Sequence, residues 1–117
     1  MESNKEIGDE AEKLAVSYLK DQGYDIQVCN YRYKKGEVDI VAIDKLHRPE
    51  LLVFVEVKFR KNNYYGEPEE FISVQKMNLL YDLAEFYTYS KNWQKDIRFD
   101  AISVNGNNEI THIKDIV

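Results

Sequence analysis

This chain of 117 residues has one cysteine and no long apolar run, and each shortage excludes a class of protein. Cys29 cannot form a disulfide scaffold within the chain, and an unpaired thiol is typical of a reducing compartment. The longest apolar run, Leu51 to Val55, is far shorter than the roughly 20 residues that a membrane span needs. The start of the chain is charged and has no apolar stretch, so no signal peptide is expected. We therefore expect a cytoplasmic protein that does not partner a membrane.

Basic residues are also fewer than acidic ones: the chain has 16 lysines and arginines and 21 acidic residues, which gives a net charge of −5. A protein that binds nucleic acid by bulk attraction is normally basic, so a non-specific coat protein is excluded. An acidic enzyme with a local basic rim remains compatible with this composition. The basic residues that could form such a rim gather in two clusters: Arg32, Lys34 and Lys35, and Lys58, Arg60 and Lys61.

Aromatic residues are abundant, with nine tyrosines, five phenylalanines and one tryptophan, which excludes a disordered chain. At this length, folding buries about two-thirds of the surface of the unfolded chain, enough for a core. No repeat, low-complexity tract or linker divides the sequence. A single domain over residues 1–117 is therefore expected.

The spacing of apolar residues predicts the order of the helices and strands. From Ile7 they recur at helical spacing until Gly23, with Ser3 or Asn4 as the N-cap. A second helix is predicted from an N-cap at Ser73 to about Ser90. Apolar and β-branched runs predict five strands: Tyr24–Tyr33, Glu37–Asp44, Leu51–Arg60, Arg98–Val104 and Glu109–Ile113. The predicted fold is therefore α/β, in the order helix, three strands, helix and two strands, with a mixed central sheet flanked by helices.

Charged residues interrupt the third predicted strand, whose start is continuously apolar. Side chains alternate along a strand, so one face carries Leu52, Phe54, Glu56, Lys58 and Arg60. The apolar start indicates burial on both faces, and charges in such a strand are costly unless they are paired or bound to a metal. The alternative is a structural ion pair at the end of the strand.

Asp39 is a similar interruption in the second predicted strand. Alternation places Val38 and Ile40 together on the face opposite Asp39. If this strand forms an antiparallel hairpin with the next one, Asp39 and Glu56 can lie opposite each other. Two facing carboxylates repel unless a cation lies between them, and a hard divalent ion with oxygen ligands, Mg²⁺ or Mn²⁺, is the natural candidate.

These residues together have a chemical rationale in phosphodiester hydrolysis. Asp39, Glu56 and the backbone carbonyl of Val57 would bind the metal ion, which stabilises the charge that grows on a phosphate. Lys58 would hold the attacking water or help to deprotonate it.

The helices supply three more candidates. The second helix has a broad apolar arc of Leu79, Leu80, Leu83, Ala84, Phe86 and Tyr87. Lys76 falls near the middle of this arc and Gln75 at its edge, so the ammonium of Lys76 either snorkels past the helix start or points to an anionic group at the sheet edge. Glu12 lies at the rim of the apolar face of the first helix, one turn after Gly8, whose bare backbone would let a strand or substrate approach. The competing acid is Glu10, which could equally be a solvated charge.

A series of motifs spans nearly the whole chain: Gly8-x-x-Ala11-Glu12-x-Leu14-Ala15-x-x-Tyr18-Leu19, Gly23-Tyr24, Asn30-Tyr31-Arg32, Gly36-Glu37-Val38-Asp39-Ile40-Val41, Val53-Phe54-Val55-Glu56-Val57-Lys58-x-Arg60, Gly66, Lys76, Ala84 and Arg98-Phe99-Asp100. In this order they resemble the PD-(D/E)XK nuclease superfamily, whose core is α-β-β-β-α-β. They are more closely similar to the YraN-like family of small bacterial proteins, described as endonuclease-like, and more distantly to archaeal Holliday junction resolvases. One departure is Ala11, where that family usually has glycine.

The resemblance implies a role for each matching residue. Asp39 and Glu56 would be the metal ligands, and Lys58 the base or electrostatic stabiliser that positions the water. Glu12 would be an additional carboxylate for a second metal ion, and Lys76 would lie near the scissile phosphate.

Two functions follow from these observations. The first is a Mg²⁺- or Mn²⁺-dependent endonuclease acting on DNA, with branched or structured DNA as a substrate class. The residues expected to contact the nucleic acid are Lys76, Gln75, Arg60 and Arg32. A homodimer is expected with this function, because a DNA junction has two equivalent arms.

The second function is a non-catalytic nucleic-acid-binding or protein-interaction module that retains the nuclease fold. The net charge of −5 favours it, as do aromatic residues expected at the surface: Tyr64, Tyr65, Tyr89 and Trp93. A zinc site is not expected, because His47 and His112 have no cysteine or acid at ligand spacing.

Overall fold

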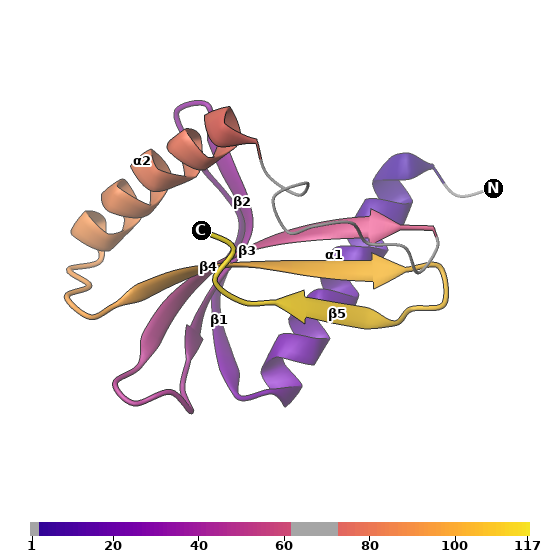
Figure 1. Ribbon diagram of the computed structural model, residues 1–117, viewed down its shortest axis with the longest axis horizontal. Helices are drawn as coiled ribbons and strands as arrows, with labels where there is room; N and C mark the ends of the chain where they lie inside the picture. The colour runs from indigo at the N-terminus through magenta and orange to yellow at the C-terminus, as the bar shows by residue number, and fades with distance from the viewer. Residues whose placement is uncertain (1–2, 62–72) are drawn as a thin grey trace.

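The computed structural model describes residues 3–61 and 73–117, and the elements follow the predicted order (Figure 1). The helices are α1, Asn4–Asp21, and α2, Val74–Ser90. The strands are β1, Tyr24–Tyr33; β2, Gly36–Asp44; β3, Leu51–Arg60; β4, Ile97–Asn105; and β5, Ile110–Ile113. They form one sheet in the order β1-β2-β3-β4-β5, in which β3 and β4 are parallel and the other neighbours antiparallel. The mixed α/β fold with its helix-strand-strand-strand-helix-strand core is thus confirmed.

Local capping explains where the helices begin and end. Ser3 is the N-cap of α1, where its side chain accepts a hydrogen bond from the Glu6 amide at 3.2 Å. Ser73 caps α2 in the same way, accepting from the Lys76 amide at 3.1 Å. After α1 the chain turns at Gly23, whose φ of 90° is a conformation that glycine adopts without strain. None of the helices in the described ranges is long and apolar enough to cross a membrane.

The two helices lie on opposite faces of the sheet (Figure 1). Helix α1 packs its alanines and Leu19 on a cluster that includes Val53 and Val55, while α2 packs on a cluster that includes Leu52 and Phe54. Strand β3 therefore has core on both faces, as its sequence predicts, and its first six residues are buried. This strand is the buried centre of the sheet, and its second half carries Glu56.

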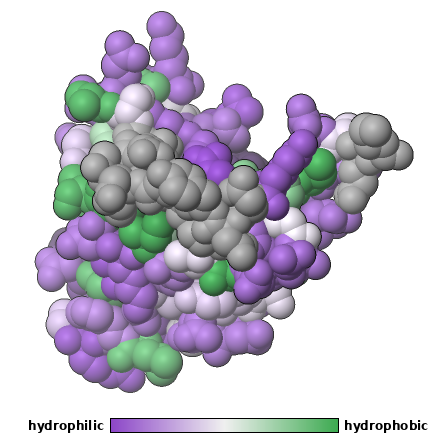
Figure 2. Space-filling view, turned by 45° about the vertical axis from the view of Figure 1, so that its right-hand side comes forward, coloured by the Kyte–Doolittle hydropathy of each residue, from purple (hydrophilic) through white to green (hydrophobic). Residues whose placement is uncertain are grey.

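The buried stripe of α2 is narrower than the apolar arc predicted for it. Its buried residues are Leu80, Leu83, Ala84 and Tyr87. Leu79 and Phe86, at the edges of the predicted arc, are 36% and 42% exposed. Figure 2 shows a largely hydrophilic face, on which hydrophobic residues form separate patches.

The side-chain alternation of β2 breaks at Asp39. Val38 belongs to the cluster under α2, whereas Ile40 belongs to the cluster under α1, so the prediction that they share a face was wrong. The residue across from Asp39 in β1 is Asn30, whose φ of 54° lies outside the extended region. The register pairs Cys29 with Ile40 and continues two residues later with Tyr31 and Val38, passing over Asn30 and Asp39. Asp39 thus lies between the two residues at which β2 changes its buried face.

Candidate active site

Glu56 is a buried carboxylate that the described residues satisfy only in part. Its side chain follows Phe54 on the α2 face of β3, and the residue is 6% exposed. One oxygen, Oε1, accepts a hydrogen bond from Lys76 Nζ at 2.8 Å and lies 3.9 Å from Lys58 Nζ. The other oxygen, Oε2, is buried without a hydrogen-bond partner among the described residues. A buried charged oxygen without a partner is costly, so this atom needs a cation or a donor.

Asp39 reaches the same place from β2. The antiparallel register of β2 and β3 pairs Ile40 with Val55, and one further step along it brings Asp39 beside Glu56. Asp39 Oδ2 accepts a hydrogen bond from the Val57 amide at 2.7 Å, which fixes its side chain against β3. Asp39 and Glu56 line one cavity of about 440 Å³. The carboxylates expected to face each other across the hairpin are therefore brought together.

The crowding of charges in this cavity changes the proton affinities of its groups. Burial, and after it the charge of Asp39, raises the pKa of Glu56 to about 7, although the lysine contacts act in the opposite direction. Burial and the charge of Lys76 lower the pKa of Lys58. Burial opposes the ammonium form of Lys76, but its hydrogen bond to Glu56 prevails and raises the pKa of Lys76. Shifts in both directions within one cavity are typical of functional sites.

The first turn of α2 forms one wall of the cavity, with Ser73, Gln75 and Lys76. This turn contains no acidic residue, and a helix N-terminus carries a partial positive charge that favours anions. The turn between β1 and β2 forms the opposite wall and approaches α2 closely at Gly36. A Cβ at Gly36 would lie 2.9 Å from the Leu79 carbonyl oxygen, so only glycine allows this spacing. Lys76 was expected to point either past the helix start or to an anion, and the anion is Glu56.

Glu12 lies apart from this group. Its Oε1 accepts a hydrogen bond from Asn30 Nδ2 at 2.9 Å, and burial, followed by the charge of Asp39, raises the pKa of Glu12. Within residues 3–61 and 73–117, no three His, Cys, Asp or Glu side chains gather to hold a metal ion. A Cβ at Gly8 would meet no atom within 4 Å in the described part of the chain, so the close approach expected there is not found.

The other residues predicted to contact nucleic acid differ in whether they line the cavity. Gln75 is exposed and lines it directly. Arg60 lies on the same face of β3 as Glu56 by alternation, and is half-buried. Arg32 pairs with Glu37 at 3.2 Å, with 74% of its side chain exposed. The structure thus brings together Asp39, Glu56, Lys58 and Lys76, and leaves Arg32 and Glu12 at the periphery.

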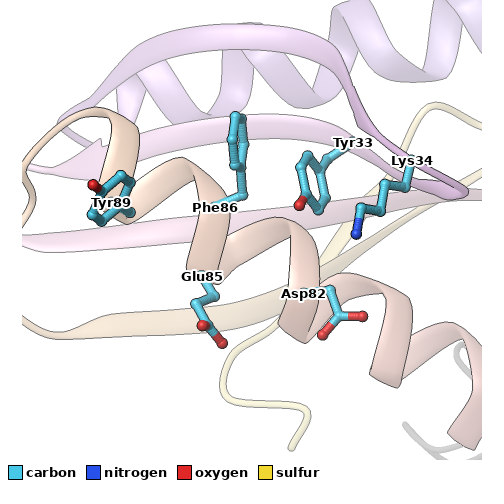
Figure 3. A pocket seen from close by; sticks show the side chains of 6 residues that line it. All are labelled: Tyr33, Lys34, Asp82, Glu85, Phe86 and Tyr89. Atoms are coloured by element: carbon cyan, nitrogen blue, oxygen red, sulfur yellow. The ribbon is translucent and has the colours of Figure 1, made fainter.

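A second hollow, of about 390 Å³, lies further along α2 (Figure 3). The rings of Tyr33 and Phe86 stack there with their centroids 4.3 Å apart, and Tyr89 is 85% exposed. Lys34 Nζ lies 5.4 Å from the centre of the Tyr33 ring. Trp93, expected at the surface, is half-buried against the cluster under α2. Tyr64 and Tyr65 lie outside the described residues.

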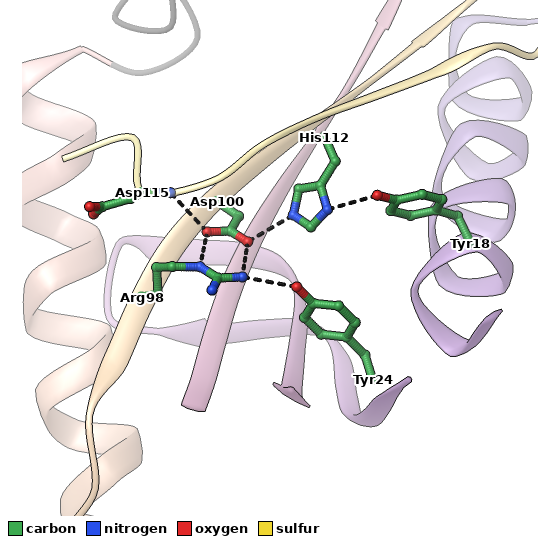
Figure 4. A network of polar contacts seen from close by, with 6 residues as sticks. All are labelled: Tyr18, Tyr24, Arg98, Asp100, His112 and Asp115. Atoms are coloured by element: carbon green, nitrogen blue, oxygen red, sulfur yellow. Dashed lines mark hydrogen bonds and ion pairs between the residues drawn. The ribbon is translucent and has the colours of Figure 1, made fainter. Parts of the chain in front are cut away.

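A second buried carboxylate lies on the α1 face of the sheet (Figure 4); it belongs to the Arg98-Phe99-Asp100 motif, for which the sequence predicted no role. Asp100 on β4 is fully buried, and its two oxygens accept hydrogen bonds from Arg98 Nε and Nη2 at 2.7 and 2.8 Å. His112 Nε2 lies 2.8 Å from Oδ2, and the Asp115 amide donates to Oδ1 at 3.1 Å. Both oxygens of Asp100 are therefore occupied.

Two tyrosines extend this network toward α1 and β1. The Tyr18 hydroxyl lies 3.0 Å from His112 Nδ1, and Arg98 Nη2 donates to the Tyr24 hydroxyl at 2.9 Å. The acid that contacts His112 is twelve residues away across the β4–β5 hairpin, so no local spacing could have revealed it. The contacts tie β5 and the following segment to the sheet, which is a structural role.

Comparison with known proteins shows relatives over most of the chain. A model described as "Uncharacterised protein family UPF0102" matches residues 11–104, a range that contains the whole cavity. A UPF0102 protein of Cytophaga hutchinsonii is 40% identical over 105 residues, which cover 90% of this chain and 89% of that protein. A UPF0102 protein of Clostridium botulinum strain Hall is 43% identical over 103 residues, covering 86% and 80% of the two chains.

Proposed function

The chain belongs to the UPF0102 family, the YraN family that its motifs resemble, and we propose that it hydrolyses phosphodiester bonds in DNA with a divalent metal ion. The observation that carries the proposal is the pair of Asp39 and Glu56. Two carboxylates share a cavity in the centre of the sheet, and one buried oxygen of Glu56 has no partner among the described residues. The adjacent lysines are the groups that phosphate chemistry would need.

The oxygen atoms at this position suit Mg²⁺ or Mn²⁺. Asp39, Glu56 and the carbonyl of Val57 would hold the ion, and a small protein-ligand set is usual for Mg²⁺, which keeps water and substrate phosphate oxygens in its shell. The N–H and C=O of one strand residue point to the same side, so the Val57 carbonyl is on the side where its amide meets Asp39. The bound ion would supply a polarised phosphoryl oxygen and a more acidic water.

The chain's own residues would handle the proton and the phosphate. Lys58 extends from the central strand beside Glu56, and its lowered pKa leaves more of the amine unprotonated, and so able to accept a proton, than in an ordinary lysine. It would hold the attacking water and take part of its proton. Lys76 and the first turn of α2 would hold the phosphate, where positive charge is most useful as negative charge grows. Glu12 would be an additional carboxylate for a second metal ion, and its charge interacts with that of Asp39.

The acidic composition limits how DNA can be held. With a net charge of −5, binding depends on local contacts rather than bulk attraction, and Gln75, Arg60 and Arg32 would provide them near the cavity. Branched or structured DNA is the proposed substrate class. A homodimer would present two sites to a junction, and light scattering tests this directly.

Cleavage assays test the proposed activity. Purified chain is incubated with labelled four-way junction, flap, linear duplex and single-stranded DNA, in Mg²⁺, Mn²⁺ or EDTA. Cleavage should require the metal ion and should fall at least about 100-fold in Asp39→Asn, Glu56→Gln and Lys58→Met, as when a general acid-base or electrostatic group is removed. Asp25→Asn, an exposed acid on β1, is the matched control and should cleave like the unaltered chain.

Two outcomes would contradict the proposal. Cleavage that survives Asp39→Asn would come from a contaminating nuclease. A folded chain that binds Mg²⁺ through Asp39 but cleaves none of these substrates would not be a nuclease of this class.

The second hollow supports an alternative, a nucleic-acid-binding module without catalysis. Stacked Tyr33 and Phe86 and the exposed Tyr89 offer aromatic faces on which unpaired bases stack. Under this alternative Tyr89→Ala weakens the binding of single-stranded DNA, while Asp39→Asn leaves binding unchanged. Calorimetry that detects no binding of Mg²⁺ dependent on Asp39 would favour it over hydrolysis.

A further inference from the structure

Lys76 occupies a position that helix electrostatics disfavour. It lies three residues after the N-cap Ser73, in the first turn of α2, where the partial positive charge of the helix repels a cation. Helix α1 has an acid, Glu6, in its corresponding turn. The side chain of Lys76 nevertheless reaches into the cavity and donates to Glu56 Oε1 at 2.8 Å, with 35% of its surface exposed. The carboxylate therefore holds the ammonium in place.

With Asp39 and Glu56 both ionised, the charges around Glu56 are balanced before any ion enters the cavity. The ammonium groups of Lys58 and Lys76 offset these two carboxylates, and Lys35 and Glu37, which also line the cavity, offset each other. A divalent cation would leave two positive charges in excess, and this excess favours either the departure of a lysine or the arrival of an anion. Lys76 is the lysine in direct competition with an ion, because its Nζ lies 2.8 Å from Glu56 Oε1, whereas Lys58 Nζ lies 3.9 Å from the same oxygen.

We infer that Lys76 substitutes for the divalent cation at Glu56 in the metal-free chain and, once that site is loaded, is released to bind a phosphate of the DNA. This inference rests on the proposed function and adds to it that Lys76 becomes available to the phosphate only in the loaded chain. Metal binding and DNA binding are then coupled through one side chain, and each strengthens the other by the same factor.

Lysine NMR of the whole chain tests the release directly. Lysines are reductively methylated with ¹³C, and the Lys76 signal is assigned by its loss in Lys76→Arg. Addition of Mg²⁺ should move this signal to the position of exposed lysines, while the signal of Lys13 on α1 should stay unchanged. In Glu56→Gln the Lys76 signal should already lie at the released position without Mg²⁺.

DNA affinity supplies an independent readout. Fluorescence anisotropy measures the binding of a junction with phosphorothioate linkages, which resist cleavage, with Mg²⁺ and with EDTA. Lys76→Met should reduce the gain in affinity on adding Mg²⁺ about tenfold, the expected value of a charge-assisted hydrogen bond. It should also lower the salt slope by about one, and only with Mg²⁺ present. Lys13→Met is the matched control and should leave the gain unchanged.

The outcomes separate the two proposals. If calorimetry finds no Mg²⁺ binding that depends on Asp39 and Glu56, the proposed function is wrong. If Mg²⁺ binds but the Lys76 signal does not move, or Lys76→Met keeps the full gain in DNA affinity, only the release of Lys76 is wrong.

Discussion

Asp100 and Glu56 are buried on opposite faces of the same sheet, and they differ in their hydrogen bonds and in the direction of their pKa shifts. Asp100, on the α1 face, has both oxygens bonded, to Arg98, His112 and the Asp115 amide. Burial alone would raise its pKa, but the hydrogen bonds from His112 and Arg98 hold the pKa of Asp100 below its ordinary value. Glu56, on the α2 face, keeps one unpartnered oxygen among the described residues and has a pKa raised to about 7.

The difference in hydrogen bonding distinguishes a carboxylate with a structural role, Asp100, from one in the candidate active site, Glu56. Buried polar groups in native proteins are nearly always hydrogen-bonded, and the Asp100 network shows that this chain can achieve it. Glu56 lies in the buried central strand, and its Oε2 still has no hydrogen-bond partner in the part of the chain that the structure describes, so the missing contact is a feature of that site. Each prediction below changes one side of this contrast.

The largest effect is expected at Asp100. Asp100→Asn leaves the guanidinium of Arg98 without its charged partner, and breaking a buried ion pair from one side costs about 3–5 kcal/mol. Urea unfolding should therefore show this loss, or no folded protein at all. Asp25→Asn, on the exposed side of β1, should change stability by no more than about 0.5 kcal/mol. Equal effects of the two substitutions would show that the network does not stabilise the fold.

Mg²⁺ should stabilise the chain through Glu56 and Asp39. At a hundredfold excess over its Kd, a ligand that binds only the folded state adds about 2.7 kcal/mol. The gain should be larger at pH 8 than at pH 6, because protons compete for Glu56 below its pKa of about 7. Thermal unfolding with Mg²⁺ and with EDTA measures it. Asp39→Asn should abolish the gain and Asp100→Asn, where folded, should retain it; an unchanged gain in Asp39→Asn would contradict the metal site.

In EDTA, Glu56→Gln should stabilise the chain at pH 8 by about 2 kcal/mol, because a neutral amide replaces a partly unpaired charge. Folding raises the pKa of Glu56 from 4.5 to about 7, so the folded chain binds more protons than the unfolded chain between these pH values. Stability of the unaltered chain should fall as pH rises through this window, and Glu56→Gln should remove that dependence. Asp100, with its lowered pKa, contributes stability that is lost only as pH falls below about 3.8. A pH profile unchanged by Glu56→Gln would refute this account of Glu56.

The smallest effect is expected from the N-caps, which form a matched pair. Ser73→Ala and Ser3→Ala each remove one capping hydrogen bond and should cost about 1 kcal/mol. Only Ser73→Ala should also change the pH dependence attributed to Glu56, because the turn that Ser73 caps carries Lys76. Chemical unfolding at several pH values measures both effects. A similar change in Ser3→Ala would mean that the caps act on global stability alone.

The sequence predicted the elements and the central pair of the site because both depend on local patterns. Periodicity located the helices, and strand alternation with a short hairpin placed Asp39 near Glu56. The face change at Asp39 escaped prediction, because it lies across from the left-handed Asn30 in another strand. The Asp100 network escaped for a related reason, since its partners come from α1, β1, β4, β5 and the segment that follows β5.

The sequence left the direction of the Lys76 side chain open. Its place within an apolar arc was compatible with a side chain that passes the helix start or with one that points to an anion, and the structure shows the second. The identity of Glu56 as that anion depends on how α2 packs against β2, where Gly36 sets the spacing. The periodicity of apolar residues in a helix does not predict how closely that helix packs against a neighbouring strand.

The hydrogen bond from the Val57 amide to Asp39 has a consequence for how the molecule opens. Strand β3 is the middle strand of the sheet, so local fraying at the edges does not reach this amide. Its hydrogen should exchange with deuterium only when the whole domain unfolds, at a rate set by global stability. The contact between Asp39 and β3 would then last as long as the core itself, and a substrate would meet this carboxylate already in place.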